Sequence, residues 1–202
     1  MLGTKILEER KSEYNGNIKV VRSLGFGTYI LVGGLTQSGG IVTDIWRNTL
    51  RKIYNSGFKI QTVLILGLGG GTVAKLVGKY WPKSKVTGVE IDRVMVELGE
   101  KYLVIGNVKV IIGDAYEFIK KNKEIYDLVI VDLYIGDKFP EKFEEEEFLR
   151  KLTKNKLVVI NRLYFGEKRK EAVVFGNKLE KIFMNVEWFY PPANVMFLCY
   201  NK

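Results

Sequence analysis

The chain has 202 residues, of which 47% are hydrophobic and 27% charged, which is ordinary for one folded core domain with a small extension. No apolar run approaches the ~20 residues of a membrane-spanning helix, and the first residues do not resemble a signal peptide, so we expect a cytoplasmic protein without membrane contact. One cysteine and no histidine exclude an internal disulfide and leave no ligand cluster for zinc, and we expect no metal.

A net charge of +9 is typical of proteins that bind nucleic acid, so nucleic acid is considered as a partner. The lysines are scattered, however, and most lie where surface helices are expected to end, a position that favours a positive charge in itself. The sequence contains no known nucleic-acid-binding motif. We therefore expect a small-molecule acceptor as the substrate and do not expect nucleic acid as a partner.

Two regions are predicted along the chain. Residues 1–40 are expected to form a β-rich extension, because short apolar runs at 4–7, 18–24 and 28–32 are separated by glycines that indicate turns. Residues 41–202 are expected to form the core domain, which begins with an amphipathic helix over 41–54.

The core is predicted to be an α/β fold of the Rossmann-like type. Strands and helices alternate from residue 63 to residue 160, a pattern typical of a mostly parallel sheet with helices on its faces. A helix over 166–183 follows, and then two short aromatic-rich runs, 186–190 and 194–200, separated by two prolines. Such a pair predicts an antiparallel hairpin at the end of the sheet.

Glycines or acids follow four successive strands of this core. The first strand runs into a glycine-rich turn in which the conformational freedom of glycine lets the backbone approach a ligand. The turn glycines and the acids that end the next three strands are Gly67, Gly69, Gly71, Glu90, Asp114 and Asp132. Ligands of open α/β sheets bind beyond the carboxyl ends of the strands, and Glu90 stands where a carboxylate holds ribose hydroxyls, so we expect a nucleoside-type ligand.

The spacing of the glycines distinguishes between two nucleoside-containing ligands, NAD and SAM. A dinucleotide fingerprint needs a glycine at position 72, where this chain has threonine. The glycines have instead the spacing found in class I S-adenosylmethionine (SAM) enzymes. The pair Gly113-Asp114, which Ala115 follows, resembles the acid that faces the adenine amino group in those enzymes. SAM is therefore a better expectation than NAD.

Together these motifs resemble the core of the spermidine synthase family. The resemblance lies in residues 63–71, 86–92, 110–115 and 126–132, and weaker N-terminal motifs extend it over about residues 5–165. It implies SAM or decarboxylated SAM as the donor, Gln37 near that donor, and a homodimer that pairs through the extension. Asp92, two residues after Glu90, is expected either to contact the donor or to cap the next helix.

The chain departs from the family at several positions. The family has an aspartate where this chain has Gly70, a tyrosine-histidine pair after the glutamine, and Asp-x-x-Asp-Pro after the fourth strand. Here Asp132 is present, but the second acid is displaced to Asp137 and the proline is missing. An acid at position 70 would repel the carboxylate of intact SAM, so Gly70 favours intact SAM as the donor.

Asp132 is the candidate catalytic residue. The resemblance implies that this acid deprotonates an amine, and a carboxylate at a strand end can accept a proton, although it can also cap a loop. Tyr134 is a candidate contact for the acceptor. The acidic run 141–147 predicts either the solvated start of a helix or an acidic rim that attracts a cationic acceptor.

Three functions remain open. Methyl transfer from intact SAM to an unknown acceptor is the leading hypothesis, and aminopropyl transfer from decarboxylated SAM to an amine is the first alternative. A nucleoside-binding protein without catalysis is the second alternative, because the chain has no histidine and no activated nucleophile. Transfer from a sulfonium can proceed largely by positioning, so a missing base does not exclude catalysis.

Overall fold

The computed structural model describes residues 3–201, which form two sheets. The first is a small antiparallel sheet whose strands follow one another in chain order: β1 (Thr4–Ser12), β2 (Gly16–Ser23), β3 (Gly27–Val32) and β4 (Leu35–Gly39). β1 is longer than the predicted run 4–7. β4 has only one large apolar residue, so hydrophobic alternation does not predict it.

The second sheet is the core of the molecule and has seven strands in the order β10-β11-β9-β8-β5-β6-β7. Its strands are β5 (Thr62–Leu66), β6 (Lys85–Glu90), β7 (Lys109–Ile112), β8 (Leu128–Val131), β9 (Leu157–Leu163), β10 (Asn185–Phe189) and β11 (Asn194–Tyr200). β5 to β9 are parallel to one another, and β11 is antiparallel to both of its neighbours. The predicted α/β fold, with its mostly parallel sheet and terminal antiparallel hairpin, is confirmed.

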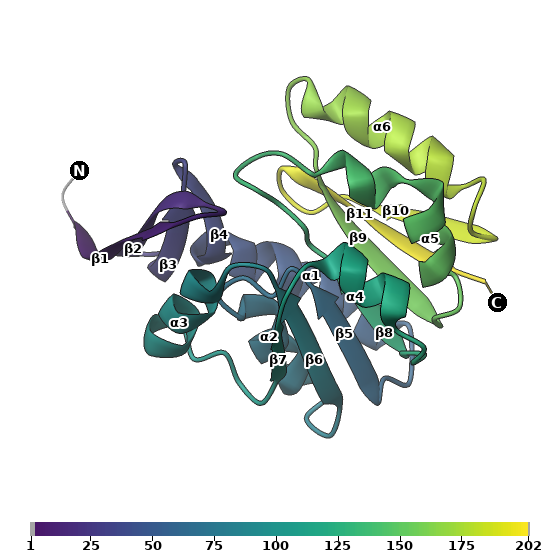
Figure 1. Ribbon diagram of the computed structural model, residues 1–202, viewed down its shortest axis with the longest axis horizontal. Coiled ribbons are helices and arrows are strands. Elements are labelled where there is room, and N and C mark those ends of the chain that lie inside the picture. The colour runs from purple at the N-terminus through teal and green to yellow at the C-terminus, as the bar shows by residue number, and fades with distance from the viewer. Residues whose placement is uncertain (1–2, 202) are drawn as a thin grey trace.

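Helices cover both faces of the core sheet (Figure 1). They are α1 (Gly40–Asn55), α2 (Thr72–Tyr80), α3 (Arg93–Tyr102), α4 (Ala115–Lys121), the short 3₁₀ helix η1 (Glu141–Glu144), α5 (Glu146–Leu152) and α6 (Lys168–Leu179). In β5, Val63 and Ile65 pack with α1 and α2, whereas Leu64 and Leu66 pack with α4, α5 and α6. A strand that is buried on both faces is a continuous apolar run, which is why β5 is predictable.

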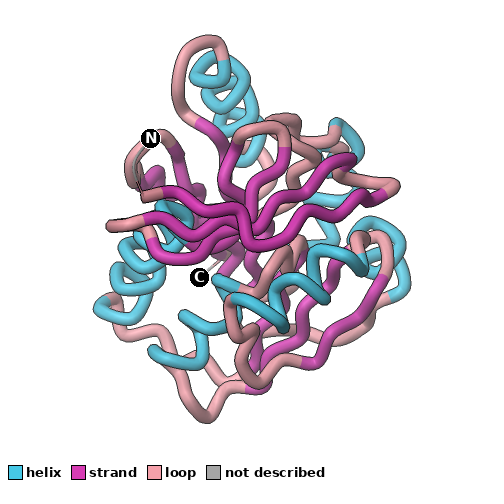
Figure 2. The backbone as a smooth tube through the Cα atoms, turned by 90° about the vertical axis from the view of Figure 1, so that its left-hand side faces the viewer, coloured by secondary structure: helices cyan, strands magenta, loops and turns pink. Residues whose placement is uncertain are grey.

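The small sheet packs against α3. Ile18, Val20 and Ile30 form a buried cluster with Met95 and Leu98 of that helix. Figure 2 views the molecule from the side on which this sheet lies. The sheet ends at Gly39, and α1 begins at the next residue.

Two buried hydrogen bonds also join β4 to the glycine loop, which we define as residues 67–71, and to the start of α2. The Gly70 N–H donates to Ser38 Oγ at 2.8 Å, and the Gly39 N–H donates to Thr72 Oγ1 at 2.7 Å. The small sheet therefore lies beside the carboxyl end of β5, where the sequence predicts a ligand.

Candidate active site

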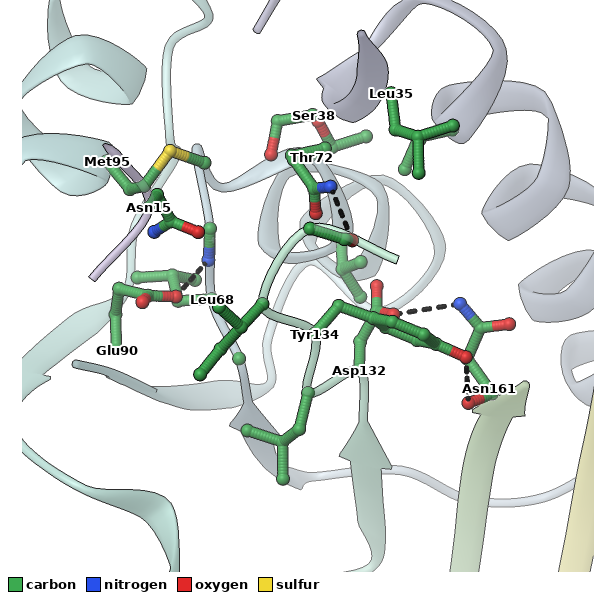
Figure 3. Close-up of a pocket in the computed structure, with 18 of the residues that line it drawn as sticks. Asn15, Leu35, Ser38, Leu68, Thr72, Glu90, Met95, Asp132, Tyr134 and Asn161 are labelled. Carbon is green, nitrogen blue, oxygen red and sulfur yellow. Dashed lines mark hydrogen bonds between the residues drawn. The ribbon is translucent and has the colours of Figure 1, made fainter. Parts of the chain in front are cut away.

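A cavity of about 600 Å³ lies at the carboxyl ends of the core strands. We call the part lined by residues within 67–73, 89–91 and 113–115 the glycine-loop end. We call the part lined by residues within 34–46, 132–136, 161–165 and 193–194 the Asp132 end. Figure 3 shows Glu90 on one side of this cavity and Tyr134 and Asn161 on the other.

Glu90 lies at the glycine-loop end, with 8% of its surface exposed. Its carboxylate oxygens accept hydrogen bonds from the N–H of Gly69 at 2.7 Å and from the N–H of Asp92 at 3.0 Å. Burial raises the pKa of Glu90 above its ordinary value, although these N–H groups oppose the shift. Each oxygen has a further lone pair, so the carboxylate can also accept a hydrogen bond from a ligand hydroxyl.

Asp114 lies at the same end and caps α4. It accepts hydrogen bonds from the N–H of Tyr116 at 2.7 Å and of Glu117 at 3.3 Å, and its other oxygen forms an ion pair with Lys142. Burial alone would raise the pKa of Asp114, but Lys142 and the two N–H groups outweigh it and lower the pKa. Ala115, the next residue, is buried and also lines the cavity.

Gly67 and Gly69 line the cavity, and close packing explains the glycine at position 67. Gly67 has a φ of 86°, and a Cβ there would lie 2.1 Å from the backbone oxygen of Asp132. A side chain would therefore separate the chain after β5 from the chain after β8.

Two further predicted ligand contacts, Gly71 and Asp92, do not line the cavity. Gly71 precedes α2 with a φ of 82°, and a Cβ there would lie 2.7 Å from Ile105. Asp92 is the N-cap of α3 and accepts hydrogen bonds from the Val94 N–H at 2.9 Å and from Asn15 Nδ2 at 2.6 Å. The structure thus gives both residues contacts with the protein and does not bring them to the cavity.

Asp132 lies at the other end of the cavity, directly after β8. Its Oδ2 accepts a hydrogen bond from Trp46 Nε1 at 2.9 Å, and its Oδ1 accepts one from Asn161 Nδ2 at 2.8 Å. Asn161 is oriented in turn by Asn194 Nδ2, which donates to Asn161 Oδ1 at 2.7 Å. Burial raises the pKa of Asp132, and the Asn161 and Trp46 donors only partly oppose this rise.

Tyr134 and Gln37 also line the Asp132 end. The Tyr134 hydroxyl accepts a hydrogen bond from the Leu163 N–H at 2.9 Å and donates to the Asn161 carbonyl at 3.3 Å. Burial raises the pKa of Tyr134, so its hydroxyl stays protonated. Gln37 Nε2 donates to the Gly136 carbonyl at 3.0 Å and so joins β4 to the loop after β8.

Sequence reasoning does not find several lining residues that make polar contacts: Asn15, Ser38, Trp46, Lys142, Asn161 and Asn194. Trp46 lies within the predicted helix 41–54, where an aromatic residue fits an apolar face equally well. Asn161 is a polar residue within an apolar run of the sequence, and this interruption is the one signal that could have identified it. In the structure the residue is buried, with 6% of its surface exposed.

The acidic run 141–147 does not form a rim of this cavity. Its lining members are Lys142 and Phe143. Glu144 forms an ion pair with Arg162 at 2.6 Å, and Glu145 accepts a hydrogen bond from the Tyr116 hydroxyl at 2.9 Å. The run instead forms η1 and the start of α5, as the first of the two expectations has it, and the alternative of an acidic rim that attracts a cationic acceptor is not supported.

The glycine-loop end fits the nucleoside of a SAM-type donor. Glu90 can accept hydrogen bonds from ribose hydroxyls, and Asp114 can accept one from an adenine amino group. Leu68 and Met95 add apolar surface to the same lining. Within residues 3–201, no group of three or more histidine, cysteine, aspartate or glutamate residues could hold a metal ion. No helix in this range is long and apolar enough to cross a membrane.

The comparisons with known proteins agree with this geometry. The family model of the spermine/spermidine synthase domain matches residues 53–161. The polyamine aminopropyltransferase of Vibrio vulnificus (strain CMCP6) is 32% identical over 133 residues, which are 58% of this chain and 44% of that protein. The polyamine aminopropyltransferase of Sulfurisphaera tokodaii is 33% identical over 141 residues, which are 64% of this chain and 46% of that protein. The chain thus spans less than half the length of these relatives.

A solved structure has the same fold along nearly the whole chain. The crystal structure of a probable spermidine synthase from Corynebacterium glutamicum superposes with a TM-score of 0.83 and covers 98% of this chain and 81% of that one. The sequence identity of this pair is 18%, so the similarity shows the fold alone.

Proposed function

We propose that this chain, which belongs to the spermine/spermidine synthase family, transfers an aminopropyl group from decarboxylated SAM to an amine. The observation that carries the proposal is the position of Asp132, a single acid held by two neutral donors in a cavity whose other end fits a nucleoside. The relatives named polyamine aminopropyltransferase support the same reaction.

The charges that line the cavity favour decarboxylated SAM over intact SAM. Among the described residues, the charged lining groups are Glu90, Asp114, Asp132 and Lys142. Lys142 is in an ion pair with Asp114, so within residues 3–201 no unpaired cation lines the cavity for the carboxylate of intact SAM. Decarboxylated SAM lacks that carboxylate and keeps its ammonium group, which a negatively charged cavity attracts.

The packing at Gly70 does not support the expectation that this glycine favours intact SAM. Gly70 is buried and does not line the cavity. A Cβ at this position would lie 2.8 Å from Ile30 and 3.0 Å from Leu103 and Ser38. An acid at position 70 would therefore point into the packing around the small sheet, and its absence does not favour either donor.

Asp132 is the proposed base. When bound, decarboxylated SAM supplies an aminopropyl carbon attached to a positively charged sulfur, and the electron pair of the broken C–S bond stays on that sulfur. The amine nitrogen forms the new C–N bond and gives its proton to Asp132, whose raised pKa increases its affinity for that proton. Trp46 and Asn161 orient the carboxylate, and the ring of Tyr134 forms part of the adjacent wall.

The donor is proposed to bind at the glycine-loop end, with Glu90 on the ribose and Asp114 on the adenine. Gly67, Gly69 and Ala115 form the adjacent lining, and Gln37, the further predicted donor contact, lines the Asp132 end, where it donates to the Gly136 carbonyl. Methyl transfer, the leading hypothesis from the sequence, has less support, because the relatives and the cavity charges both favour aminopropyl transfer.

The proposal predicts release of 5′-methylthioadenosine when the protein is incubated with decarboxylated SAM and amines. Asp132→Asn should lower this rate by about 10²- to 10⁴-fold, the usual contribution of a general base, while nucleoside affinity stays within about twofold. The matched control is Asp137→Asn, because Asp137 is an exposed acid in the same loop that does not line the cavity. Methyl transfer from intact SAM with no aminopropyl transfer would contradict the proposal, and binding without any product would favour the non-catalytic alternative.

A further inference from the structure

The positive charge of the chain is concentrated in one segment. Residues 45–89, between Asp44 and Glu90, contain no aspartate or glutamate. They contain eight basic residues: Arg47, Arg51, Lys52, Lys59, Lys75, Lys79, Lys83 and Lys85. The whole chain has 32 basic and 23 acidic residues, so this segment accounts for eight of its nine net positive charges.

The structure brings much of this charge to one face of the molecule. α1 and α2 pack against each other on the same face of the core sheet, so the exposed side chains of both helices point away from the sheet on the same side. Four exposed cations lie there: Arg51 on α1, Lys75 and Lys79 on α2, and Lys83 in the loop that follows α2. Together with the exposed ring of Tyr54 on α1, we call these residues the α1–α2 face.

The four cations of the α1–α2 face have no ion-pair partner in the described part of the chain. The basic residues of α1 that do form ion pairs are Arg47, with Asp44, and Lys52, with Glu187. The charges of the face are therefore available to an anion from outside the chain.

Aromatic rings lie among these cations. Tyr54 exposes 52% of its surface, and its ring centroid lies 5.6 Å from that of Tyr80 and 5.9 Å from that of Trp81. Trp81 is buried and supports the exposed ring. Arg51 is about one helical turn before Tyr54, and Lys79 is next to Tyr80, so the face combines cations with a supported aromatic surface.

This combination distinguishes between polyanions. Cations alone attract any polyanion, whether or not it carries bases. An exposed tyrosine ring in addition provides a surface on which a base can stack, and a single strand presents its bases together with its phosphates. A duplex presents phosphates but keeps its bases paired and stacked inside.

We infer that the α1–α2 face binds single-stranded nucleic acid, with phosphates on its four cations and a base on Tyr54. The sequence does not lead to this partner, because the lysines are scattered along it and only the packing of two helices brings them together. None of the residues of the face lines the cavity, so the inference does not depend on the proposed aminopropyl transfer.

The first test measures the binding of a fluorescein-labelled 15-nucleotide oligo(dT) by fluorescence anisotropy at several salt concentrations. We expect the logarithm of the affinity to fall with the logarithm of the salt concentration with a slope of about −2 to −3, since each phosphate contacted by a cation contributes about −0.7 for a single strand. No binding at about 50 mM salt, or an affinity that does not respond to salt, would overturn the inference.

Charge reversal then locates the surface. The double variant Arg51→Glu/Lys79→Glu should lower the affinity for the oligonucleotide by at least tenfold and leave aminopropyl transfer within about twofold of the parent. The matched control is Lys120→Glu/Lys123→Glu, which changes the net charge equally at exposed positions at the end of α4 and just after it, on the other face of the core sheet. Equal losses in the two variants would show that net charge alone governs binding and would overturn the inference.

Substitution of the ring tests the contact with a base. Tyr54→Leu should lower the affinity for the oligonucleotide by about tenfold, within the range of one stacked base, and leave unchanged the affinity for heparin, a polyanion without bases. The control is Tyr190→Leu, because Tyr190 is 53% exposed and also packs against a tyrosine, Tyr164, but lies outside the face. Equal losses for oligo(dT) and heparin in Tyr54→Leu, or tighter binding of duplex DNA or anionic lipid vesicles than of the single strand by the parent protein, would overturn the inference.

Discussion

The two ends of the cavity differ in how the chain builds them. At the glycine-loop end, Glu90 is the last residue of β6 and Asp114 is the second residue after β7, and each accepts a backbone hydrogen bond from a residue two positions further along the chain. At the Asp132 end, the carboxylate accepts hydrogen bonds from Trp46, which is 86 residues away, and from Asn161, which is 29 residues away. Local chain geometry shapes much of the first end, and tertiary packing shapes the second.

Asp114 and Asp132 also differ in their pKa, whereas burial raises the pKa of Glu90 as it does that of Asp132. Lys142 pairs with Asp114 and contributes to a lowered pKa, so this acid remains an anion that can hold a ligand. The groups that hydrogen-bond to Asp132 are a neutral indole and a neutral amide, and burial raises its pKa. An acid with increased proton affinity suits a base, whereas a permanent anion suits binding.

The largest expected effect concerns the glycine loop, where position 70 contacts the small sheet and not the ligand. Gly70→Asp should lower the free energy of unfolding by about 3–5 kcal/mol, because it places an unpaired carboxylate against Ile30 and Leu103. Chemical denaturation measures the loss, and titration of intact and decarboxylated SAM on the folded fraction measures donor preference, which should not change.

Gly78→Asp is the matched control. Gly78 lies in α2, is exposed, and has nothing within 4 Å of a built Cβ, so this variant should stay within about 0.5 kcal/mol of the parent. A Gly70→Asp protein of unchanged stability that binds only decarboxylated SAM would show that position 70 does face the donor.

A smaller effect is expected for Glu90, which tests the nucleoside assignment of the glycine-loop end. Glu90→Ala should weaken the binding of 5′-methylthioadenosine by about 2 kcal/mol, or roughly 30-fold, because the ribose hydroxyls lose a charged acceptor. Isothermal titration calorimetry measures the affinity.

Two further variants isolate the ligand contact of Glu90. Glu90→Gln retains an oxygen that can accept one of the Gly69 and Asp92 hydrogen bonds, so it separates lost binding from a disturbed loop. Glu145→Ala removes an acid outside the cavity lining and should leave nucleoside affinity nearly unchanged. Equal losses of nucleoside affinity in the Glu90 and Glu145 variants would show that Glu90 does not contact the nucleoside.

Most of the core fold can be predicted from the sequence, because most core strands are apolar runs with a glycine, an acid or a turn at the end. Glu90, Asp114 and Asp132 can be identified for the same reason, since the carboxyl ends of parallel strands meet at one edge of a sheet. β4 cannot be found this way, because its residues are mostly small or polar and it contacts partners that are distant in the chain.

The direction of the side chains in the glycine loop cannot be predicted from spacing. Gly67, Gly70 and Gly71 belong to one motif, yet their built Cβ atoms face the chain after β8, the small sheet and Ile105 respectively. The partners of Asp132 are equally hidden, because nothing near Trp46 or Asn161 in the sequence indicates which acid they meet.

The smallest expected effect concerns Trp46, a residue of α1 that positions Asp132 through a direct hydrogen bond. Trp46→Phe keeps an aromatic ring but removes the indole N–H, a donor that lowers the pKa of Asp132. The pKa of Asp132 should therefore rise further. Below this pKa the carboxyl group already holds a proton and cannot accept one from the amine, so the acidic limb of the pH–rate profile should move to higher pH. At neutral pH we expect a loss of about tenfold in kcat, the size of one hydrogen bond to a charged group.

Trp188→Phe provides the control for the loss of an indole donor. Trp188 Nε1 donates to Glu180 at 2.9 Å, also an indole-to-carboxylate bond, but neither residue lines the cavity. This variant should keep the parental pH–rate profile even if its stability falls. If Trp46→Phe lowers stability and kcat without moving the acidic limb, Trp46 only packs the core, and the pKa of Asp132 is then set by burial, which raises it, against the Asn161 donor, which lowers it.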